Sequence, residues 1–283
     1  MSYAIGVVCD VGVGPDLGGR NRNEDNFLVC YDGEARFHSE EGRLIVEPQL
    51  GEGALVAVCD GMGGHEDGDV AASTAVQVLR KLYQPSAPRH PARVLLKYIM
   101  DSHRQLYNAA NEEGPVSMGT TLTVAWFVHG TVAWAHVGDS RLYLLRRGEL
   151  LQLSTDQTRN EFARRDGLPL TRDGEHLVQN FIYGSRGLGD NTDLRLEHGL
   201  DSGAEVLYPG DRVLLCSDGV TTGLKHEALR EILADTLDPQ VAAEILTRRA
   251  QQAGTRDNVT AVVVRVDEVK DMPVAAVRIA DAS

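Results

Sequence analysis

The sequence predicts an α+β fold built from antiparallel sheets. Short β-like segments dominate the first half of the chain, and the helical patterns are grouped between them instead of alternating with single strands. Neighbouring β-like segments are joined by tight turns such as His129-Gly130, which is typical of antiparallel hairpins. A regular alternation of strand and helix would instead indicate a parallel sheet.

Candidate strands are short apolar, β-branched or aromatic runs that end in polar turn residues. They are residues 4–9, 27–31, 54–59, 120–128, 131–137, 142–145, 150–153, 213–216 and 258–266. Residues 34–53 are polar and contain glycine between two short β-like pieces, and we interpret them as an excursion or a hairpin.

Candidate helices are stretches in which apolar residues recur three or four positions apart. The first begins near Asp69, and the second includes Leu95 and Leu106 and ends near Gly114-Pro115. Residues 225–252 carry two further helical patterns, separated near Asp238-Pro239. Their spacing suits packing against a core and requires no functional explanation.

Residues 154–200 are polar, rich in glycine and only weakly periodic, which indicates a surface subdomain or flap. A length of 283 residues allows one large domain or two small ones. We expect residues 1–268 to form one domain that includes this flap, and residues 269–283 to form a mobile tail.

Bulk composition argues against several classes of protein. No apolar run reaches the roughly 18 to 20 residues that cross a bilayer, and the N-terminus lacks the basic region of a signal peptide. We therefore expect a cytoplasmic protein with no membrane contact. The formal net charge of −13 argues against nucleic-acid binding through a basic face. The four cysteines form no CxxC pair and are interpreted as small buried hydrophobes.

Acidic residues follow or precede the strands at five places. The motifs are Asn23-Glu24-Asp25, Cys59-Asp60-Gly61, Gly138-Asp139-Ser140, Ser217-Asp218-Gly219 and Arg256-Asp257-Asn258. Carboxylates that converge at strand ends repel one another unless a cation lies between them, and Mg²⁺ and Mn²⁺ prefer oxygen ligands. Any one of these motifs is by itself more simply explained as a turn or a solvated loop, so the metal hypothesis rests on their combination.

The complete set of motifs resembles the PPM family, the PP2C-type protein phosphatases, in its short bacterial form. The motifs occur in family order between residues 10 and 265: Gly19-Arg20-Asn21-Arg22-Asn23-Glu24-Asp25, Val58-Cys59-Asp60-Gly61-Met62-Gly63-Gly64-His65, Met118-Gly119-Thr120-Thr121, Val137-Gly138-Asp139-Ser140-Arg141, Leu214-Leu215-Cys216-Ser217-Asp218-Gly219-Val220-Thr221 and Arg256-Asp257-Asn258-Val259-Thr260. The resemblance implies a four-layer α-β-β-α sandwich, in which helices flank two antiparallel sheets.

The resemblance also implies the roles of the acidic residues. Asp60 would bridge two divalent ions, Mn²⁺ or Mg²⁺. Glu24 and the carbonyl of Gly61 would complete one metal site, and Asp218 and Asp257 the other. Asp25 would orient metal-bound water. Bacterial members often hold a third, weaker ion, which would use Asp139 together with Asp218.

The implied activity is hydrolysis of phosphoserine and phosphothreonine in proteins. Two ions about 3.5 to 4 Å apart lower the pKa of a bridging water to near 7 and clamp the attacking oxygen for in-line displacement. This mechanism requires no covalent intermediate, and therefore no cysteine nucleophile. Arg20 would bind the phosphate, because its planar fork matches two phosphate oxygens.

Two regions depart from the family pattern. Met62 occupies the position at which many members carry a histidine proposed as the general acid, which leaves metal-bound water and His65 as candidates. After the flap, Gly184-Ser185-Arg186-Gly187-Leu188-Gly189 replaces a common Thr-Arg-Ala-Leu-Gly stretch, and Asp156-Gln157 replaces an Asp-His pair. Substrate specificity is therefore the least predictable property.

Two alternatives to an active protein phosphatase remain open. A pseudophosphatase would bind phosphoproteins without cleaving them, although its usual signature, a lost metal ligand, is absent from this sequence. A phosphatase of a small phosphoester, or of an anti-sigma-factor antagonist, would keep the metals and change the substrate. For the protein phosphatase, we expect a monomer whose substrates are made by a serine/threonine kinase.

Overall fold

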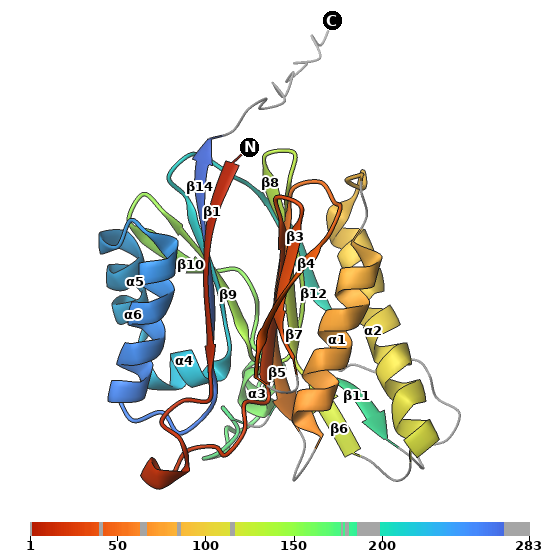
Figure 1. Ribbon diagram of the computed structural model, residues 1–283. Coiled ribbons are helices and arrows are strands. Elements are labelled where there is room, and N and C mark those ends of the chain that lie inside the picture. The colour runs from red at the N-terminus through yellow and green to blue at the C-terminus, as the bar shows by residue number, and fades with distance from the viewer. Residues whose placement is uncertain are drawn as a thin grey trace, which may run out of the picture.

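The computed structural model describes residues 2–39, 42–62, 67–83, 86–113, 117–176, 178, 181–185 and 199–268. Two antiparallel sheets lie face to face, and helices cover the outer face of each (Figure 1). The structure therefore confirms the predicted four-layer α-β-β-α arrangement. The predicted domain boundary at residue 268 stays a prediction, and the expected mobile tail, 269–283, lies outside the described residues.

Within the described residues, one sheet has five strands and the other has nine. The smaller sheet has the order β1 (Ser2–Asp10), β14 (Val259–Glu268), β13 (Arg212–Cys216), β9 (Arg141–Arg146) and β10 (Glu149–Gln152). The larger has the order β12 (Asp201–Val206), β8 (Thr131–Val137), β7 (Leu122–Val128), β5 (Ala54–Met62), β2 (Asp25–Tyr31), β3 (Glu34–His38) and β4 (Leu44–Pro48), and β6 (Ser117–Thr120) joins the end of β5 to β11 (Ile182–Ser185).

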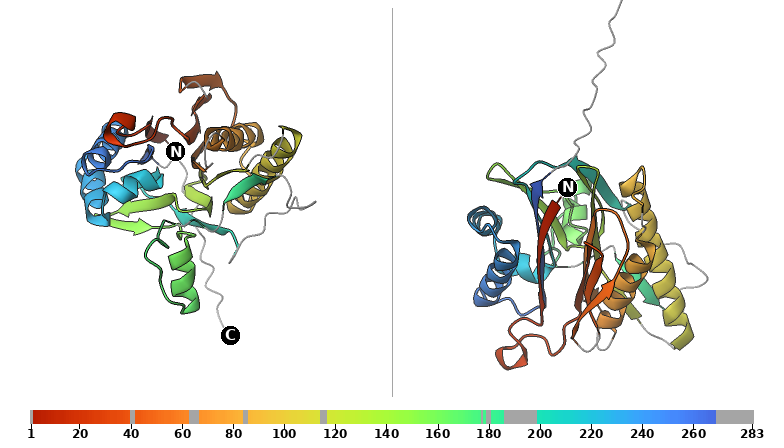
Figure 2. Two further views of the ribbon diagram at one scale, coloured as in Figure 1. Left: turned by 90° about the horizontal axis from the view of Figure 1, so that it is seen from below. Right: turned by 45° about the horizontal axis from the view of Figure 1, so that its top comes forward.

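The helices divide into two groups that cover opposite faces (Figure 1). The larger sheet is covered by α1 (Gly68–Leu82) and α2 (Pro91–Glu113), and the smaller by α4 (Asp218–Gly223), α5 (His226–Asp235) and α6 (Pro239–Gln252). A short helix, α3 (Arg159–Asp166), projects away from both groups in the left view of Figure 2. Among the described residues, no helix has both the length and the apolar character needed to span a bilayer.

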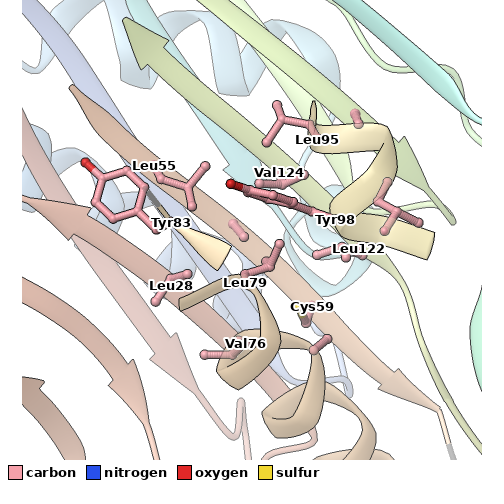
Figure 3. Packing of buried hydrophobic residues seen from close by; sticks show 14 of the residues in the cluster. Leu28, Leu55, Cys59, Val76, Leu79, Tyr83, Leu95, Tyr98, Leu122 and Val124 are labelled. Carbon is pink, nitrogen blue, oxygen red and sulfur yellow. The ribbon is translucent and has the colours of Figure 1, made fainter. Parts of the chain in front are cut away.

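Three apolar layers hold these four structural layers together. Strand β2 illustrates why, because its side chains alternate between two buried surfaces. Leu28 and Cys30 pack toward α1 and α2, in the cluster that Figure 3 shows, whereas Phe27 and Val29 pack between the sheets. A third cluster lies between the smaller sheet and its helices.

Strands β3 and β4 pair antiparallel and extend the larger sheet, which agrees with the hairpin that was one of the two interpretations of residues 34–53. Several elements differ from the sequence prediction, including β6, β11 and α3, and three further differences have a clear physical reason. Strand β5 continues to Met62 because its last residues pair with β6. Asp218 begins the short helix α4 where a turn was expected. Strand β12 was missed, since Ser202, Gly203 and Ala204 have low β propensity and pairing with β8 decides their conformation.

Candidate metal centre

The acidic motifs meet at the end of the sandwich where α1 begins (the lower end in Figure 1). A cavity of about 280 Å³ opens there, and it is lined by all the predicted metal-binding residues and by the predicted phosphate-binding arginine. Its lining residues are Arg20, Glu24, Asp60, Gly61, Met62, Asp139, His176, Val178, Asp218 and Asp257. The structure thus brings together residues that lie up to 237 positions apart in the chain.

Both sheets contribute acids to this cavity. From the larger sheet, Glu24 precedes β2, Asp60 lies near the end of β5, and Asp139 follows β8. From the smaller sheet, Asp218 follows β13 and Asp257 precedes β14. The acids converge because the antiparallel strands begin and end at the same edge of the sandwich.

Two threonines fix the backbone of Asp60. Its N–H donates to Thr121 Oγ1 over 3.0 Å, and its carbonyl accepts from the N–H of Thr121 over 2.9 Å and from Thr120 Oγ1 over 3.0 Å. Thr121 Oγ1 lies 2.8 Å from Ser140 Oγ, beside Asp139. Thr121 and Ser140, to which the sequence analysis assigned no role, therefore help to position Asp60 and Asp139.

Gly61 brings the first metal-binding group together. A Cβ atom at this position would lie 2.2 Å from Gly68 O and 2.5 Å from Glu24 O, which no side chain tolerates. A Cβ atom on Gly68 would lie 3.0 Å from the carboxyl carbon of Glu24 and 3.1 Å from Gly61 O. The two glycines therefore leave the Glu24 carboxylate and the Gly61 carbonyl side by side, as a metal site that uses both requires.

Asn258 links the two sheets at the cavity. Its Oδ1 accepts from the N–H of Glu24 over 2.9 Å, and its Nδ2 donates to the carbonyls of Val11 and Arg22 over 3.1 and 2.9 Å. Because Asn258 follows Asp257 directly, these bonds place one acid from each sheet. The sequence motif contains this asparagine, but its role was not predicted. An amide side chain directly beside a predicted metal ligand could have indicated that role.

Asp25 lies beside the cavity and does not line it. Its side chain is buried, and Oδ2 accepts hydrogen bonds of 2.7 Å from both Ser217 Oγ and Thr260 Oγ1. Burial raises the pKa of Asp25 to about 7, and the two hydroxyl groups oppose this shift. Asp25 faces Asp60 across β2 and β5, which suits the predicted role of a neighbour that orients the contents of the site.

The cavity is electrostatically unfavourable for its own carboxylates. Burial raises the pKa of Asp60 well above its usual range, and Asp25, Asp218 and Asp139 raise it further. Burial and the charge of Asp218 raise the pKa of Asp139 to about 8. The pKa values of Glu24 and Asp218 are also raised, chiefly by burial. Carboxylates that perturb one another in this way favour a bound cation.

The donor set fits a hard divalent cation. It consists of carboxylate oxygens and one carbonyl oxygen, the ligands that Mg²⁺ and Mn²⁺ prefer. In the part of the chain that the structure describes, no three His, Cys, Asp or Glu side chains are close enough to hold an ion by themselves. This arrangement is compatible with ions that keep several waters as ligands.

Arg20 contacts a predicted metal ligand. Its Nε and Nη2 donate to Asp257 Oδ1 and Oδ2 over 2.9 and 3.0 Å, and about half of its side chain is exposed. The guanidinium is thus placed at the cavity wall by the same carboxylate that the sequence assigns to a metal. The two assignments are coupled, because a cation at Asp257 competes with Arg20 for the carboxylate.

The flap contributes a residue that the sequence analysis missed. His176 lines the cavity next to Val178, which pairs with Thr158. Met62 lines the cavity where many family members carry histidine, and His65 lies outside the described residues, as do residues 186–189 of the divergent stretch.

Gln157, which replaces the family's histidine, has a structural role. Its N–H donates to Gly138 O over 2.7 Å, and its Oε1 accepts from the N–H of Gly138 over 3.1 Å. The side chain and backbone of Gln157 thus hold the residue before Asp139. The departure from the family pattern preserves the position of this acid.

The fold and the cavity together define a two-sheet sandwich that carries an acidic, metal-compatible site between its sheets. Residues 47–254 match the family model described as protein phosphatase 2C, and the chain belongs to this family. It is 30% identical over 257 residues to "Protein phosphatase PhpP" of Streptococcus pneumoniae serotype 2, an alignment that covers 89% of this chain and 96% of PhpP.

Solved structures agree with this assignment. The Mycobacterium tuberculosis serine/threonine phosphatase PstP/Ppp matches with a TM-score of 0.73 and 26% identity, over 95% of this chain and 100% of that one. A structure of the PstP catalytic domain in complex with two manganese ions matches with a TM-score of 0.72 and 27% identity, over 94% of this chain and 100% of that one.

Proposed function

We propose that this chain is a metal-dependent phosphatase that hydrolyses phosphoserine and phosphothreonine in proteins. The observation that carries the proposal is the single cavity at which Glu24, Asp60, Gly61, Asp218 and Asp257 meet, in a member of the protein phosphatase 2C family. The related proteins PhpP and PstP/Ppp bear the names protein phosphatase and serine/threonine phosphatase, which supports the substrate class.

Two divalent ions would be held by this chain, in agreement with the two manganese ions of the related PstP structure. Asp60 contacts both ions in this proposal, Glu24 and the Gly61 carbonyl complete one site, and Asp218 and Asp257 complete the other. Asp139 and Asp218 would hold a third, weaker ion. When bound, such ions make hydroxide available near neutral pH and neutralise the charge of the phosphate.

The chain's own residues bind and orient the substrate. Arg20 lies at the cavity wall with an exposed guanidinium, so it can bind two phosphate oxygens when it leaves Asp257. Asp25, anchored by Ser217 and Thr260, keeps its carboxyl group in a fixed position next to Asp60. The cavity is large enough for a phosphorylated side chain but not for a folded segment.

A cysteine nucleophile is not supported. None of the four cysteines lines the cavity. Burial raises the pKa of Cys9, Cys30 and Cys216 to about 12, and it also raises the pKa of Cys59. These thiols therefore stay protonated at neutral pH and cannot act as the thiolate that nucleophilic catalysis requires.

The protein would act as a monomer, in the cytoplasm, on substrates made by a serine/threonine kinase. Four free cysteines are consistent with a reducing compartment. A phosphoprotein-binding pseudophosphatase is disfavoured because every proposed metal ligand is present. A phosphatase of small or regulatory phosphoesters would hydrolyse those substrates faster than phosphopeptides.

The test is phosphate release from a phosphothreonine peptide, with Mn²⁺ and with EDTA. We expect turnover that requires the metal and is lost in Asp218→Ala, whereas Glu231→Ala, which removes an exposed acid on α5, leaves it unchanged. A folded, metal-loaded protein without turnover on any phosphopeptide would favour the binding module instead. Faster turnover of a small phosphoester than of any peptide would favour the third alternative.

A further inference from the structure

A second cavity, of about 630 Å³, adjoins the metal cavity. The two share four lining residues, Arg20, His176, Asp218 and Asp257. The remaining walls are Gly18 and Gly19 before the first acidic motif, Thr222 on α4, and Thr255 and Arg256 before β14. A peptide whose phosphorylated side chain fills the metal cavity would therefore place a neighbouring residue in the second one.

Arg256 lies beside a glycine at one end of this cavity. Gly18 has a φ of 79°, the left-handed conformation that ends the short helix Pro15–Leu17. A Cβ atom at Gly18 would lie 3.8 Å from both Nε and Cζ of Arg256, so the guanidinium lies beside this glycine. The loop and the arginine therefore form adjoining parts of the cavity wall.

Within the described residues, two polar groups at this cavity have no partner. Arg256 is exposed, and among the described residues no carboxylate forms an ion pair with it, whereas its neighbour Arg20 is paired with Asp257. Thr255 is 2% exposed, and its Oγ1 has no hydrogen-bond partner within the described part of the chain. A buried hydroxyl without a partner is costly unless a ligand or water completes it.

We propose that this cavity is a substrate subsite for an acidic side chain close to the phosphoserine or phosphothreonine, either a carboxylate or a second phosphate. The inference rests on the proposed function. Arg256 is the specificity-determining residue, since a guanidinium pairs best with carboxylate and phosphate oxygens. Thr222 and Thr255 supply hydroxyl groups at the same cavity. The shared carboxylates, Asp218 and Asp257, are assigned to the metals and do not oppose an acidic ligand once they are neutralised.

The experiment compares phosphothreonine peptides that are identical except for one neighbour. That neighbour is acidic, phosphorylated, neutral or basic, and it is placed on either side of the phosphothreonine. The measured quantity is the ratio of kcat/KM for each charged peptide to that for the neutral one. This ratio cancels any general loss of activity in a variant.

For the wild type we expect a preference of about three- to tenfold for an acidic or phosphorylated neighbour on one side. Arg256→Glu should reverse the preference, and Thr222→Lys should increase it by adding a second cation to the wall of the same cavity. Thr255→Val, which removes only the hydroxyl, should reduce it. Raising the salt concentration should weaken it, because the charges are solvent-accessible.

Arg248→Glu is the matched control. Arg248 is exposed on α6, outside both cavities, and the substitution changes the net charge by the same amount as Arg256→Glu. Its peptide preference should equal that of the wild type. Equal changes in both variants would mean that overall charge sets the preference, and would overturn the subsite.

The outcomes separate this inference from the proposed function. Turnover of every peptide at similar ratios in the wild type, Arg256→Glu and Thr222→Lys would overturn the subsite and leave the phosphatase intact. Loss of all turnover in the wild type would overturn both. If Arg256→Glu does not fold, Thr222→Lys tests the subsite by itself: a stronger preference for an acidic neighbour supports it, and an unchanged preference overturns it.

Discussion

Asp25 and Asp60 face each other across β2 and β5, yet their carboxylates have different hydrogen-bond donors. Two hydroxyl groups, from Ser217 and Thr260, donate to Asp25. No hydroxyl or amide group among the described residues donates to the carboxylate of Asp60, whose backbone alone is held. Asp25 is therefore stabilised by hydroxyl donors, whereas Asp60, which we propose as a metal ligand, has no such donor among the described residues.

This difference separates Asp25 from the acids that we assign to the metals. Burial raises the pKa values of Asp25, Asp60, Asp139 and Asp218 alike, so the pKa values alone do not separate these residues. A sequence shows all of these residues simply as aspartates beside strands. Their separate functions follow from the donors that surround each one.

Asp60→Ala should have the largest effect. It removes the residue assigned to both metals, and we expect phosphate release to fall by more than about 10²-fold, the scale for loss of one preorganised electrostatic group. The fold should persist, because a buried carboxylate that repels its neighbours is removed. Phosphate release and circular dichroism measure the two effects, and a folded variant with most of its turnover would exclude Asp60 from the centre.

Asp25→Ala should lower both the free energy of unfolding and the turnover. It leaves the hydroxyl groups of Ser217 and Thr260 without their acceptor, a loss of about 1 to 3 kcal/mol in the free energy of unfolding. Urea titration measures this change. Asp139→Ala is the matched comparison and should cost less stability; an equal loss in the two variants would contradict the distinction between supporting and metal-binding acids.

The loss of turnover in Asp139→Ala should depend on the Mn²⁺ concentration. Because the third ion is expected to bind weakly, turnover should fall at limiting Mn²⁺ and recover in large part at saturating Mn²⁺. Titration of phosphate release with Mn²⁺ gives the result. A folded variant that is as inactive as Asp60→Ala at every concentration would show that the proposed ranking of the metal sites is wrong.

Arg20→Ala should raise KM for a phosphopeptide by about tenfold and change kcat less, because an interaction with the phosphate is lost. Arg20→Lys should be intermediate, since an ammonium group cannot make the two-pronged contact. Arg22→Ala, an exposed arginine two positions away that does not line the cavity, is the control. An unchanged KM in Arg20→Ala would count against phosphate binding by this residue.

The smallest effect concerns pH and requires metal-free protein. Burial raises the pKa of Asp25 to about 7 and of Asp139 to about 8, whereas an unfolded aspartate has a pKa of about 4. Their contribution to stability is present in acid, decreases as the pH rises, and is lost above about 7 and 8 respectively. In EDTA the melting temperature should therefore fall from pH 5 to 8.5, by about 2 to 4 °C for each kcal/mol lost.

Mn²⁺ should remove most of this pH dependence, because metal binding favours the deprotonated ligands. Asp139→Asn, which cannot titrate, should show a smaller fall in EDTA than the wild type. A melting temperature in EDTA that does not change, or that rises, over this range would contradict the raised pKa values.

The sequence by itself determined the family, the α+β class and the identity of the acidic motifs. These properties are encoded locally: apolar periodicity marks the strands and helices, and short motifs keep their residues and order. It could not reveal β12, whose Ser-Gly-Ala stretch becomes a strand only by pairing with β8, or α4, whose six residues are too few for a periodic signal.

Only the tertiary structure showed which residues position the acids of the site. Asn258, Thr121 and Gln157 carry no catalytic signature. Asn258 and Thr121 nevertheless hold the backbone of Glu24 and of Asp60, and Gln157 holds Gly138 beside Asp139. The second cavity beside Arg256 likewise joins four segments that no local pattern connects. The physical reason is that burial, pKa and hydrogen-bond partners depend on contacts between strands of two different sheets, and these contacts exist only after the sheets have packed together.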